Sequence, residues 1–301
     1  MPVGLTPHLA RLFICLGVTV GPQVHASTPA GVPGVRVGVL PVLSYALDVD
    51  DIYQERPAAR DLREQAGPWQ RRLEVAFDGL DGVTVHPGSE IQSRLLSSRV
   101  QEALEVGRER YALGLERYRG LQVEQATEHL GRARELFETA FVDVIEPREV
   151  ADVALYEGLA VIESGLESHA HVAFRRMWTL DPARSFERGY YPRATEEVVE
   201  AALQDLLATP DLAALRWPAE RLQALSPLVE VDVWITATII GSPEAPSIRV
   251  RGYDASRRAT TLDEAMPLDE WTEERLERVL SSWHGCQVDL APASFVQPRP
   301  R

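Results

Sequence analysis

The chain has 301 residues, of which 45% are hydrophobic and 25% are charged, so it is long enough for two domains and typical of globular rather than disordered proteins. Acidic residues outnumber basic residues by 45 to 31, giving a formal charge of -14. This charge opposes nucleic acid or an anionic membrane surface as the main partner and favours a neutral or basic protein. All of the basic residues are arginine, which indicates a compositional bias.

The amino terminus has the pattern of an export signal. Arg11 precedes an apolar run from Leu12 to Val20, and Val24 and Ala26 suit cleavage after Ala26. The run is too short to span a bilayer. We therefore expect residues 1–26 to be a cleavable signal peptide, residues 27–34 a flexible leader, and the protein to be periplasmic. An uncleaved anchor is the alternative, and a lipidation site at Cys15 fits less well.

The two cysteines of the chain are Cys15 and Cys286. Removal of the signal peptide would leave Cys286 alone, and one thiol cannot form an internal disulfide. No histidine, aspartate or metal-ligand set accompanies it in the sequence, so we interpret Cys286 as a buried or idle thiol rather than a nucleophile.

Residues 35–97 have the pattern of the first half of an α/β domain. Val35–Leu43 is rich in β-branched residues and predicts a buried strand ending near Pro41, and residues 83–86 predict a second, short strand. Between them, apolar residues recur at helical spacing, with a kink or a new start expected at Pro68. Ser89 is placed to cap the next helix. No Gly-rich phosphate-binding motif is present, which disfavours nucleotide binding. The apolar helix positions are Leu62, Ala66, Trp69, Leu73, Ala76, Phe77 and Leu80.

Residues 98–208 show helical spacing throughout, and residues 151–182 carry its strongest repeat pattern. Small residues, a turn residue, a large apolar residue and a terminating proline fall at regular positions, namely Gly158, Gly165, Ala170, Phe174 and Pro182. This stretch resembles a tetratricopeptide repeat, a family in which pairs of helices stack into an array. The resemblance implies protein or peptide binding.

A second, weaker repeat begins at Gly107, 44 residues before Ala151. Its matching positions are Leu113, Gly114, Ala126, Leu130 and Ala133, with Leu121 at the turn position. The family spacing is about 34 residues, so residues 141–150 extend the junction, and Pro147 is expected to begin the next helix. We expect the helix at 192–208 to cap one end of this short array and the helix beginning near Ser98 to cap the other.

The loop that follows the stronger repeat is the candidate partner-binding site. Phe186, Arg188, Tyr190 and Tyr191 lie between the repeat and its cap, where a peptide could dock. The alternative, which the frequent burial of aromatic rings favours, is that they pack the junction.

Two other groups of polar residues have side chains that could bind a ligand. Glu167, His169 and His171 have ligand side chains, but alternate residues of a helix point apart, so we expect neither a metal site nor a cofactor. Four arginines are interspersed with glutamates, which predicts a solvated helix face with local ion pairs rather than a specific anion site. They are Arg108, Arg110, Arg117 and Arg119.

After a connector at residues 209–228, the apolar period changes to two. Residues 229–239 predict a long, half-buried strand, residues 241–246 a hairpin loop, and residues 247–254 and 258–266 two further strands. A final helix follows, with Asp269 or Thr272 as its cap and its apolar face at Leu276, Val279, Leu280 and Trp283. Residues 229–288 thus form a second half, and residues 289–301 are expected to be a disordered tail.

The order of elements in residues 35–97 and 229–288 resembles the amino-terminal α/β domain of TolB and its relatives in curli-secretion and penicillin-binding-protein-activating lipoproteins. The fold class expected is therefore α+β, a layered α/β domain split by an all-helical insert. Val35–Val39 should then pair with residues 229–239 in one sheet. The β-propeller of TolB is absent, so no binding residues are carried over from it.

These patterns favour a non-enzymatic periplasmic adaptor that binds a protein or peptide of the cell envelope. The alternative is a structural or regulatory subunit of an outer-membrane secretion, motility or cell-wall machine. The motifs G-x-S-x-G, H-E-x-x-H and paired cysteines are missing, although an acid/base pair built from distant carboxylates stays open. The sequence leaves the oligomeric state open.

Overall fold

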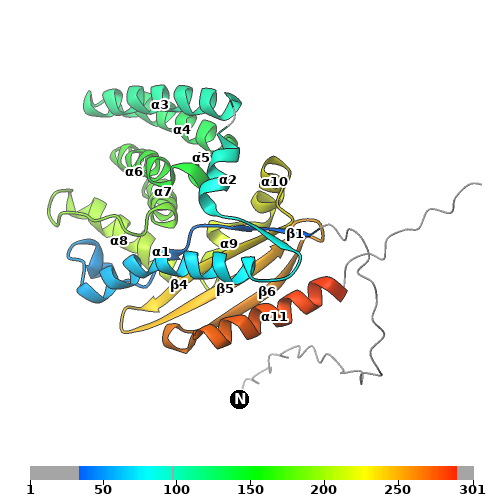
Figure 1. Ribbon diagram of the computed structural model, residues 1–301. Coiled ribbons are helices and arrows are strands. Elements are labelled where there is room, and N and C mark those ends of the chain that lie inside the picture. Colours follow the sequence, from blue (N-terminus) through cyan, green and yellow to red (C-terminus); the bar gives the residue numbers. More distant parts are fainter. Residues whose placement is uncertain (1–33, 97, 290–301) are drawn as a thin grey trace, which may run out of the picture. The chain divides into compact units, whose positions relative to one another are not determined.

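The computed structural model describes residues 34–96 and 98–289, and the fold is a mixed α+β arrangement (Figure 1). The expected signal peptide, all of the expected leader before residue 34, and residues 290–301 of the expected tail lie outside the described residues, as does the side chain of Cys286.

A six-stranded sheet joins the two ends of the described chain. Three neighbouring strands, β3, β1 and β4, are parallel, whereas β4, β5 and β6 are antiparallel. Val37 lies opposite Val233 and Val39 opposite Ile235, so the expected pairing of the first strand with residues 229–239 is confirmed. The bounds in sheet order are β3 (Val83–His86), β1 (Val35–Val39), β4 (Val233–Ser242), β5 (Ala245–Asp254) and β6 (Ala259–Pro267).

The expected strand at 35–43 is interrupted. After β1 the chain resumes pairing with β4 only at β2 (Leu43–Ser44), where Leu43 lies opposite Thr238. From Val39 to Leu43 the chain advances by four residues, whereas the paired segment of β4, from Ile235 to Thr238, advances by three. The extra residue is a one-residue bulge. Pro41 lies in the interruption and has no N–H to donate to a ladder. The bulge shifts the chain that leaves β2 relative to β1.

Strand β4 is buried on both faces, so the prediction of a half-buried strand is wrong. Its residues from Val233 to Ile239 are all buried, including the alternate positions Trp234 and Thr236. Helices α1 (Pro57–Asp78) and α11 (Glu273–Asp289) pack on one face. On the other face, the Trp234 indole N–H donates to the Ser226 hydroxyl of α10 (Ala219–Val229) at 2.7 Å. Trp234 and Thr236 have polar atoms and alternate with aliphatic residues, so the sequence pattern did not indicate that the second face is also packed.

Several predicted boundaries are corrected. Helix α1 is one helix from Pro57 and does not restart at Pro68. Ser89 lies inside α2 (Gly88–Leu95), where Pro87 is the N-cap residue and no side chain caps the helix. The predicted hairpin loop at 241–246 is a two-residue turn at 243–244, because β4 and β5 extend to its edges.

The connector and the last helix also differ in detail. Residues 209–228 contain α9 (Leu212–Arg216) and most of α10, which ends at Val229, so that residue belongs to a helix and not to the predicted strand. Thr272 does cap α11, since its hydroxyl accepts the Arg275 N–H at 3.3 Å, whereas Asp269 lies in the short helix η2 (Leu268–Glu270). Helix α11 continues through Asp289.

The helical segment contains two helix pairs and a further helix between β3 and β4 (Figure 1). The first pair packs on the second, and α8 packs on α7. A short helix, α5, joins the two pairs. The bounds are α3 (Ser98–Arg119), α4 (Val123–Thr139), α5 (Val142–Ile145), α6 (Pro147–Glu163), α7 (Glu167–Leu180) and α8 (Arg193–Leu207).

The two helix pairs repeat the same backbone at the offset of 44 residues that the sequence indicated. Leu121 and Gly165 occupy the same turn position, and both have a left-handed backbone, with φ of 55° and 75°. A Cβ built on Gly158 would lie 2.6 Å from Phe174, and the equivalent contact of Gly114 with Leu130 is 2.7 Å. In both pairs, therefore, a glycine of the first helix allows close contact with a large apolar side chain of the second helix.

None of the helices in the described part of the chain has both the length and the apolar character that a membrane crossing requires.

Candidate functional site

The predicted partner-binding loop, residues 186–192, packs against the short helix η1 (Val49–Ile52). The Phe186 N–H donates to the Ile52 carbonyl at 2.7 Å. The half-buried Phe186 ring lies with its centroid 5.4 Å from Trp178 and 5.9 Å from Tyr191. Phe186 therefore packs at the junction between the repeat and η1.

Arg188 and Tyr190 of the same loop are exposed. The Arg188 guanidinium lies 4.5 Å from the centroid of the Tyr53 ring and 3.2 Å from the Asp50 carboxylate. It therefore makes a cation–π contact and an ion pair within the chain. Tyr190 is 71% exposed and contacts Tyr191 edge-on, with centroids 4.8 Å apart. Of the four predicted residues, the two tyrosines keep accessible ring surface.

Tyr190 and Tyr191 belong to a larger group of rings. Tyr191 and Tyr156 of α6 pack against the same hydrophobic core. The Tyr156 ring lies 6.2 Å from that of Tyr111 and 5.9 Å from that of Tyr118, both on α3. We call these five residues, which are five of the eight tyrosines of the chain, the tyrosine face. Three segments that are distant in sequence supply it: α3, α6 and the loop before α8.

The tyrosine face combines apolar rings with neutral hydroxyl groups. Burial raises the pKa of Tyr111, Tyr118 and Tyr191, so these phenols keep their protons at neutral pH. The Tyr118 hydroxyl also donates to the Glu163 carboxylate at 2.9 Å, which raises its pKa further. Tyrosine rings supply a large contact area with few rotatable bonds and a polar tip that can donate or accept a hydrogen bond. The face is therefore suited to anchor a polypeptide.

Sequence reasoning missed Tyr111, Tyr118 and Tyr156. A tyrosine within a helix is typical of packing, and the ring contacts join residues of different helices, which periodicity does not reveal. One local signal was present: Arg148, Asp152 and Tyr156 are spaced by four residues and so share one face of α6.

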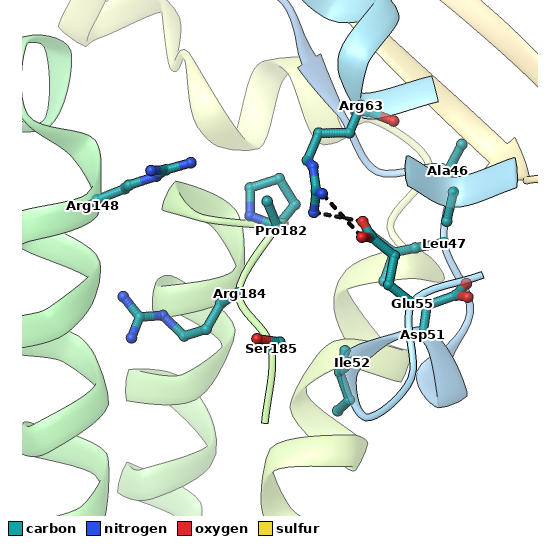
Figure 2. Close-up of a pocket in the computed structure, with 13 residues that line it drawn as sticks. Ala46, Leu47, Asp51, Ile52, Glu55, Arg63, Arg148, Pro182, Arg184 and Ser185 are labelled. Carbon is teal, nitrogen blue, oxygen red and sulfur yellow. Dashed lines mark hydrogen bonds and ion pairs between the residues drawn. The ribbon is translucent and has the colours of Figure 1, made fainter. Parts of the chain in front are cut away.

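A pocket of about 370 Å³ lies beyond the carboxyl end of β2 (Figure 2). The connection from β1 leads to β3 on one side, whereas β4 lies on the other side of β1, and clefts at such a reversal are preferred ligand sites in open α/β sheets. Residues 44–63 form one wall, and residues of the helical segment, Arg148 and residues 182–185, form the other. Those that matter below are Ser44, Asp51, Glu55, Arg63, Arg148 and Arg184.

Both carboxylates of this pocket are already neutralised. Glu55 accepts a hydrogen bond from Arg63 at 3.0 Å, and Asp51 accepts one from the Arg56 side chain at 2.8 Å. Burial acts to raise the pKa of Asp51, but the hydrogen bonds from Arg56 and from two backbone N–H groups outweigh it and hold this pKa below its usual value. Asp51 is therefore a stable anion within its ion pair.

The residues weighed as metal ligands do not form a site. His171 on α7 lies 3.1 Å from Asp205 on α8. Within residues 34–96 and 98–289, no group of three His, Cys, Asp or Glu side chains is arranged to hold a metal ion.

The arginines of α3 are used differently from the expectation. Arg108 makes two hydrogen bonds of 2.7 Å to Glu149 and so joins α3 to α6, rather than pairing within its own helix. Arg117 donates to Gln122 at 2.8 Å. At least Arg108 therefore stabilises the packing of α3 on α6.

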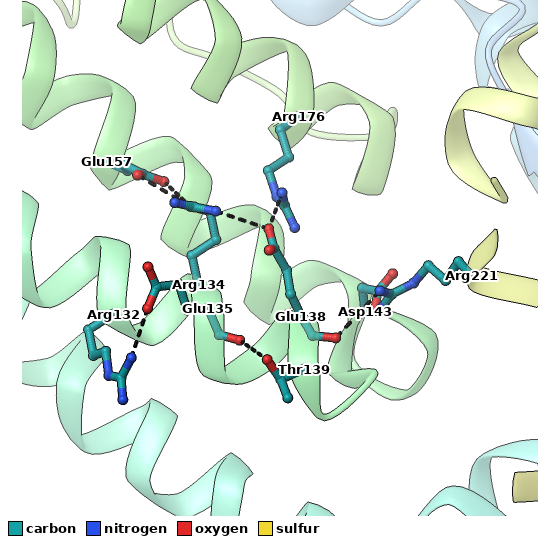
Figure 3. A network of polar contacts seen from close by, with 9 residues as sticks. All are labelled: Arg132, Arg134, Glu135, Glu138, Thr139, Asp143, Glu157, Arg176 and Arg221. Atoms are coloured by element: carbon teal, nitrogen blue, oxygen red, sulfur yellow. Dashed lines mark hydrogen bonds and ion pairs between the residues drawn. The ribbon is translucent and has the colours of Figure 1, made fainter. Parts of the chain in front are cut away.

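The charges of a second polar cluster are paired with one another (Figure 3). Asp143 of α5 receives hydrogen bonds from Arg216 of α9, at 3.1 Å, and from Arg221 of α10. Glu138 pairs with Arg134 at 3.2 Å and also with Arg176. These interactions connect the helical segment to the helices that precede β4, so we assign the cluster a structural role.

The tyrosine face and the pocket meet on α6. Arg148 lines the pocket, and Asp152 and Tyr156 follow it at one-turn intervals toward the rings. Arg184 continues the connection, since it lines the pocket and pairs with Asp152. No protein-family model, curated protein or solved structure matches this chain.

Proposed function

We propose that this protein is a non-enzymatic adaptor of the cell envelope, whose tyrosine face binds a peptide or a segment of a partner protein. The observation that carries the proposal is that five partly exposed tyrosines from three distant segments form two ring clusters that pack on one hydrophobic core. Interface hot spots are enriched in tyrosine, because a buried ring adds apolar contact and a directed hydrogen bond at a low entropy cost.

The architecture supports this proposal. The repeated helix pairs and the cap helix α8 have the arrangement expected of a short tetratricopeptide-like array, and such arrays use their helix faces to bind peptides. The array lies between β3 and β4, whose strands belong to one sheet, so we interpret it as an insert in a TolB-like α/β domain. The amino-terminal signal pattern supports a periplasmic location for this adaptor.

Site-specific photo-crosslinking tests the proposal. A photoreactive phenylalanine derivative at position 156 of the full chain, expressed in its native host, should crosslink to a discrete protein. The same derivative at Val75, which is 73% exposed on α1, serves as the matched surface control. Binding of the identified partner to the purified chain is then measured for Tyr156→Ala.

The expected result is a crosslink at position 156 but not at position 75, and a loss of affinity of about thirtyfold in Tyr156→Ala, as for a hot-spot residue of about 2 kcal/mol. Val75→Ala should retain full affinity. Equal crosslinking at both positions, or unchanged binding of Tyr156→Ala, would contradict the proposal.

The alternative, a subunit of a larger envelope machine, has its own supporting observation. Among the strands that the structure describes, β6 pairs only with β5, and its nine residues leave a long sheet edge. Such an edge can add a strand from another chain. Size-exclusion chromatography with light scattering distinguishes the adaptor from the machine subunit. Concentration-dependent assembly would favour the machine subunit, and a strict monomer at high concentration would count against self-assembly.

A further inference from the structure

The pocket beside the tyrosine face has one cation whose charge is not matched. Arg184 pairs with Asp152 and lies 3.5 Å from Asp181, and Arg63 is engaged by Glu55. Arg148, in contrast, is exposed, and no carboxylate or hydrogen-bond acceptor of residues 34–96 or 98–289 contacts its guanidinium. Figure 2 shows this side chain extending from α6 toward Pro182.

A second donor lies deeper in the same pocket. Ser44 ends β2 and is 8% exposed, and it lines the pocket. Throughout the described part of the chain, no group forms a hydrogen bond with its hydroxyl. Its hydroxyl can therefore donate a hydrogen bond to a ligand in the pocket.

The combination selects a particular ligand chemistry. Asp51 and Glu55 are already paired, so the unmatched charge of the pocket is that of Arg148. A guanidinium presents its N–H groups in a planar fork that matches the two oxygens of a carboxylate, and a serine hydroxyl can donate to the same group. A volume of about 370 Å³ holds a group the size of an amino-acid residue rather than a whole domain.

We propose that this pocket binds a carboxylate of the polypeptide held on the tyrosine face, with Arg148 as its ion-pair partner and Ser44 as a hydrogen-bond donor. The inference rests on the proposed function, because Arg148 of the pocket and Tyr156 of the tyrosine face lie on the same side of α6. The carboxylate can come from the chain terminus of the partner or from an acidic side chain, and the experiment distinguishes these sources.

Three small probes test the pocket directly, independently of any partner. N-acetylglycine carries a terminal carboxylate, N-acetylaspartic acid α-amide carries a side-chain carboxylate, and N-acetylglycinamide is the neutral analogue. Each is titrated into the full-length protein while backbone and arginine side-chain NMR signals are followed. At least one of the two acids should bind saturably and shift NMR signals of the pocket residues. The affinity of the neutral amide should be lower by a factor of about ten or more, since it lacks the charge-assisted hydrogen bonds. The acid that binds more tightly identifies the source.

Two arginine variants provide the matched comparison. Arg148→Gln should weaken the preferred acid about tenfold or more. Arg132→Gln on α4 removes an equally exposed guanidinium, paired with Glu135 outside the pocket, and should leave the affinity unchanged. Circular dichroism should show that both variants are folded. Ser44→Ala should weaken the acid further in the Arg148→Gln background.

The possible failures are distinct. If neither acid binds, if the neutral amide binds as well as the acids, or if both arginine variants behave alike, the carboxylate pocket is overturned. The adaptor function then stands or falls by the crosslink at position 156, which does not depend on these probes. Carboxylate binding without a partner on the tyrosine face would instead retain the pocket as a small-molecule site and overturn its link to a bound polypeptide.

Discussion

At the scale of single residues, Leu121 shows how closely the first helix pair follows the second. It occupies the turn position where the second pair has Gly165, and its φ of 55° lies in the left-handed region that favours glycine. The left-handed conformation costs a residue with a Cβ about 1–2 kcal/mol. The leucine side chain is 79% exposed, so burial does not offset this cost.

We expect Leu121→Gly to stabilise the protein by about 0.5–1 kcal/mol, since relief of backbone strain should exceed the extra flexibility that glycine gives the unfolded chain. Chemical denaturation measures the change. The reciprocal control is Gly165→Ala, which should destabilise the protein because it introduces a Cβ at φ of 75°. A loss of stability in Leu121→Gly would show that the turn is not strained.

At the scale of helices, the array is assembled by glycines that let two helices approach closely. A Cβ at Gly158 of α6 would lie 2.6 Å from the Phe174 ring of α7, and Phe174 is fully buried. The ring cannot move away without disturbing the core that it fills. The glycine therefore sets the distance between α6 and α7.

Gly158→Ala should destabilise the protein by about 1–3 kcal/mol through overpacking. Gly131→Ala on α4 is the matched control, because the nearest atom to its Cβ would be the Glu157 carboxylate at 3.9 Å. There the substitution should be neutral or stabilising, by up to about 1 kcal/mol, since alanine favours helix. Thermal unfolding of both variants checks the contrast, and similar effects at the two positions would refute close packing at Gly158.

At the scale of the whole described chain, a buried ion cluster ties the helical segment to the sheet (Figure 3). The side chains of Asp143 and Arg216 are 6% and 4% exposed, and Asp143 also pairs with Arg221. Asp143 belongs to α5, whereas the two arginines belong to the helices that lead into β4. The position of the tyrosine face and pocket relative to the sheet depends on this connection.

Asp143→Asn should cost about 3–5 kcal/mol, because it leaves buried guanidinium charge without a counter-ion. Glu135→Gln breaks an ion pair whose side chains are 56% and 62% exposed, and it should cost about 1 kcal/mol or less. Denaturant titration gives both free energies. If Asp143→Asn loses no more than Glu135→Gln, the cluster is not what holds the helical segment to the sheet.

The sequence anticipated much of the element order, and the reasons for its errors are local to particular residues. The 44-residue repeat offset was visible because Gly158, Ala170 and Phe174 are fixed by contacts within one helix pair. The half-buried interpretation of β4 failed at Trp234 and Thr236, which are amphipathic and look solvent-facing in a pattern, although α10 covers the Trp234 side. Ser89 failed as a cap because the helix begins one residue before it.

The candidate site divides in the same way. The loop aromatics could be found from the sequence, since Tyr190 and Tyr191 stand beside a turn and a proline. Their partners Tyr111, Tyr118 and Tyr156 could not, because only the stacking of α3 on α6 brings these rings together. The pocket could not be predicted either, because Ser44 belongs to β2 and Arg148 to α6, which are distant in the chain.

The sequence by itself determined the helices, the repeat and the net charge, because periodicity and composition act over neighbouring residues. Only the tertiary structure decided which tyrosines form one face, which pocket arginine has no counter-ion among the described residues, and which strand is covered on both faces. Those properties depend on contacts between segments far apart in the chain, and such contacts exist only after the helices have packed on one another and on the sheet.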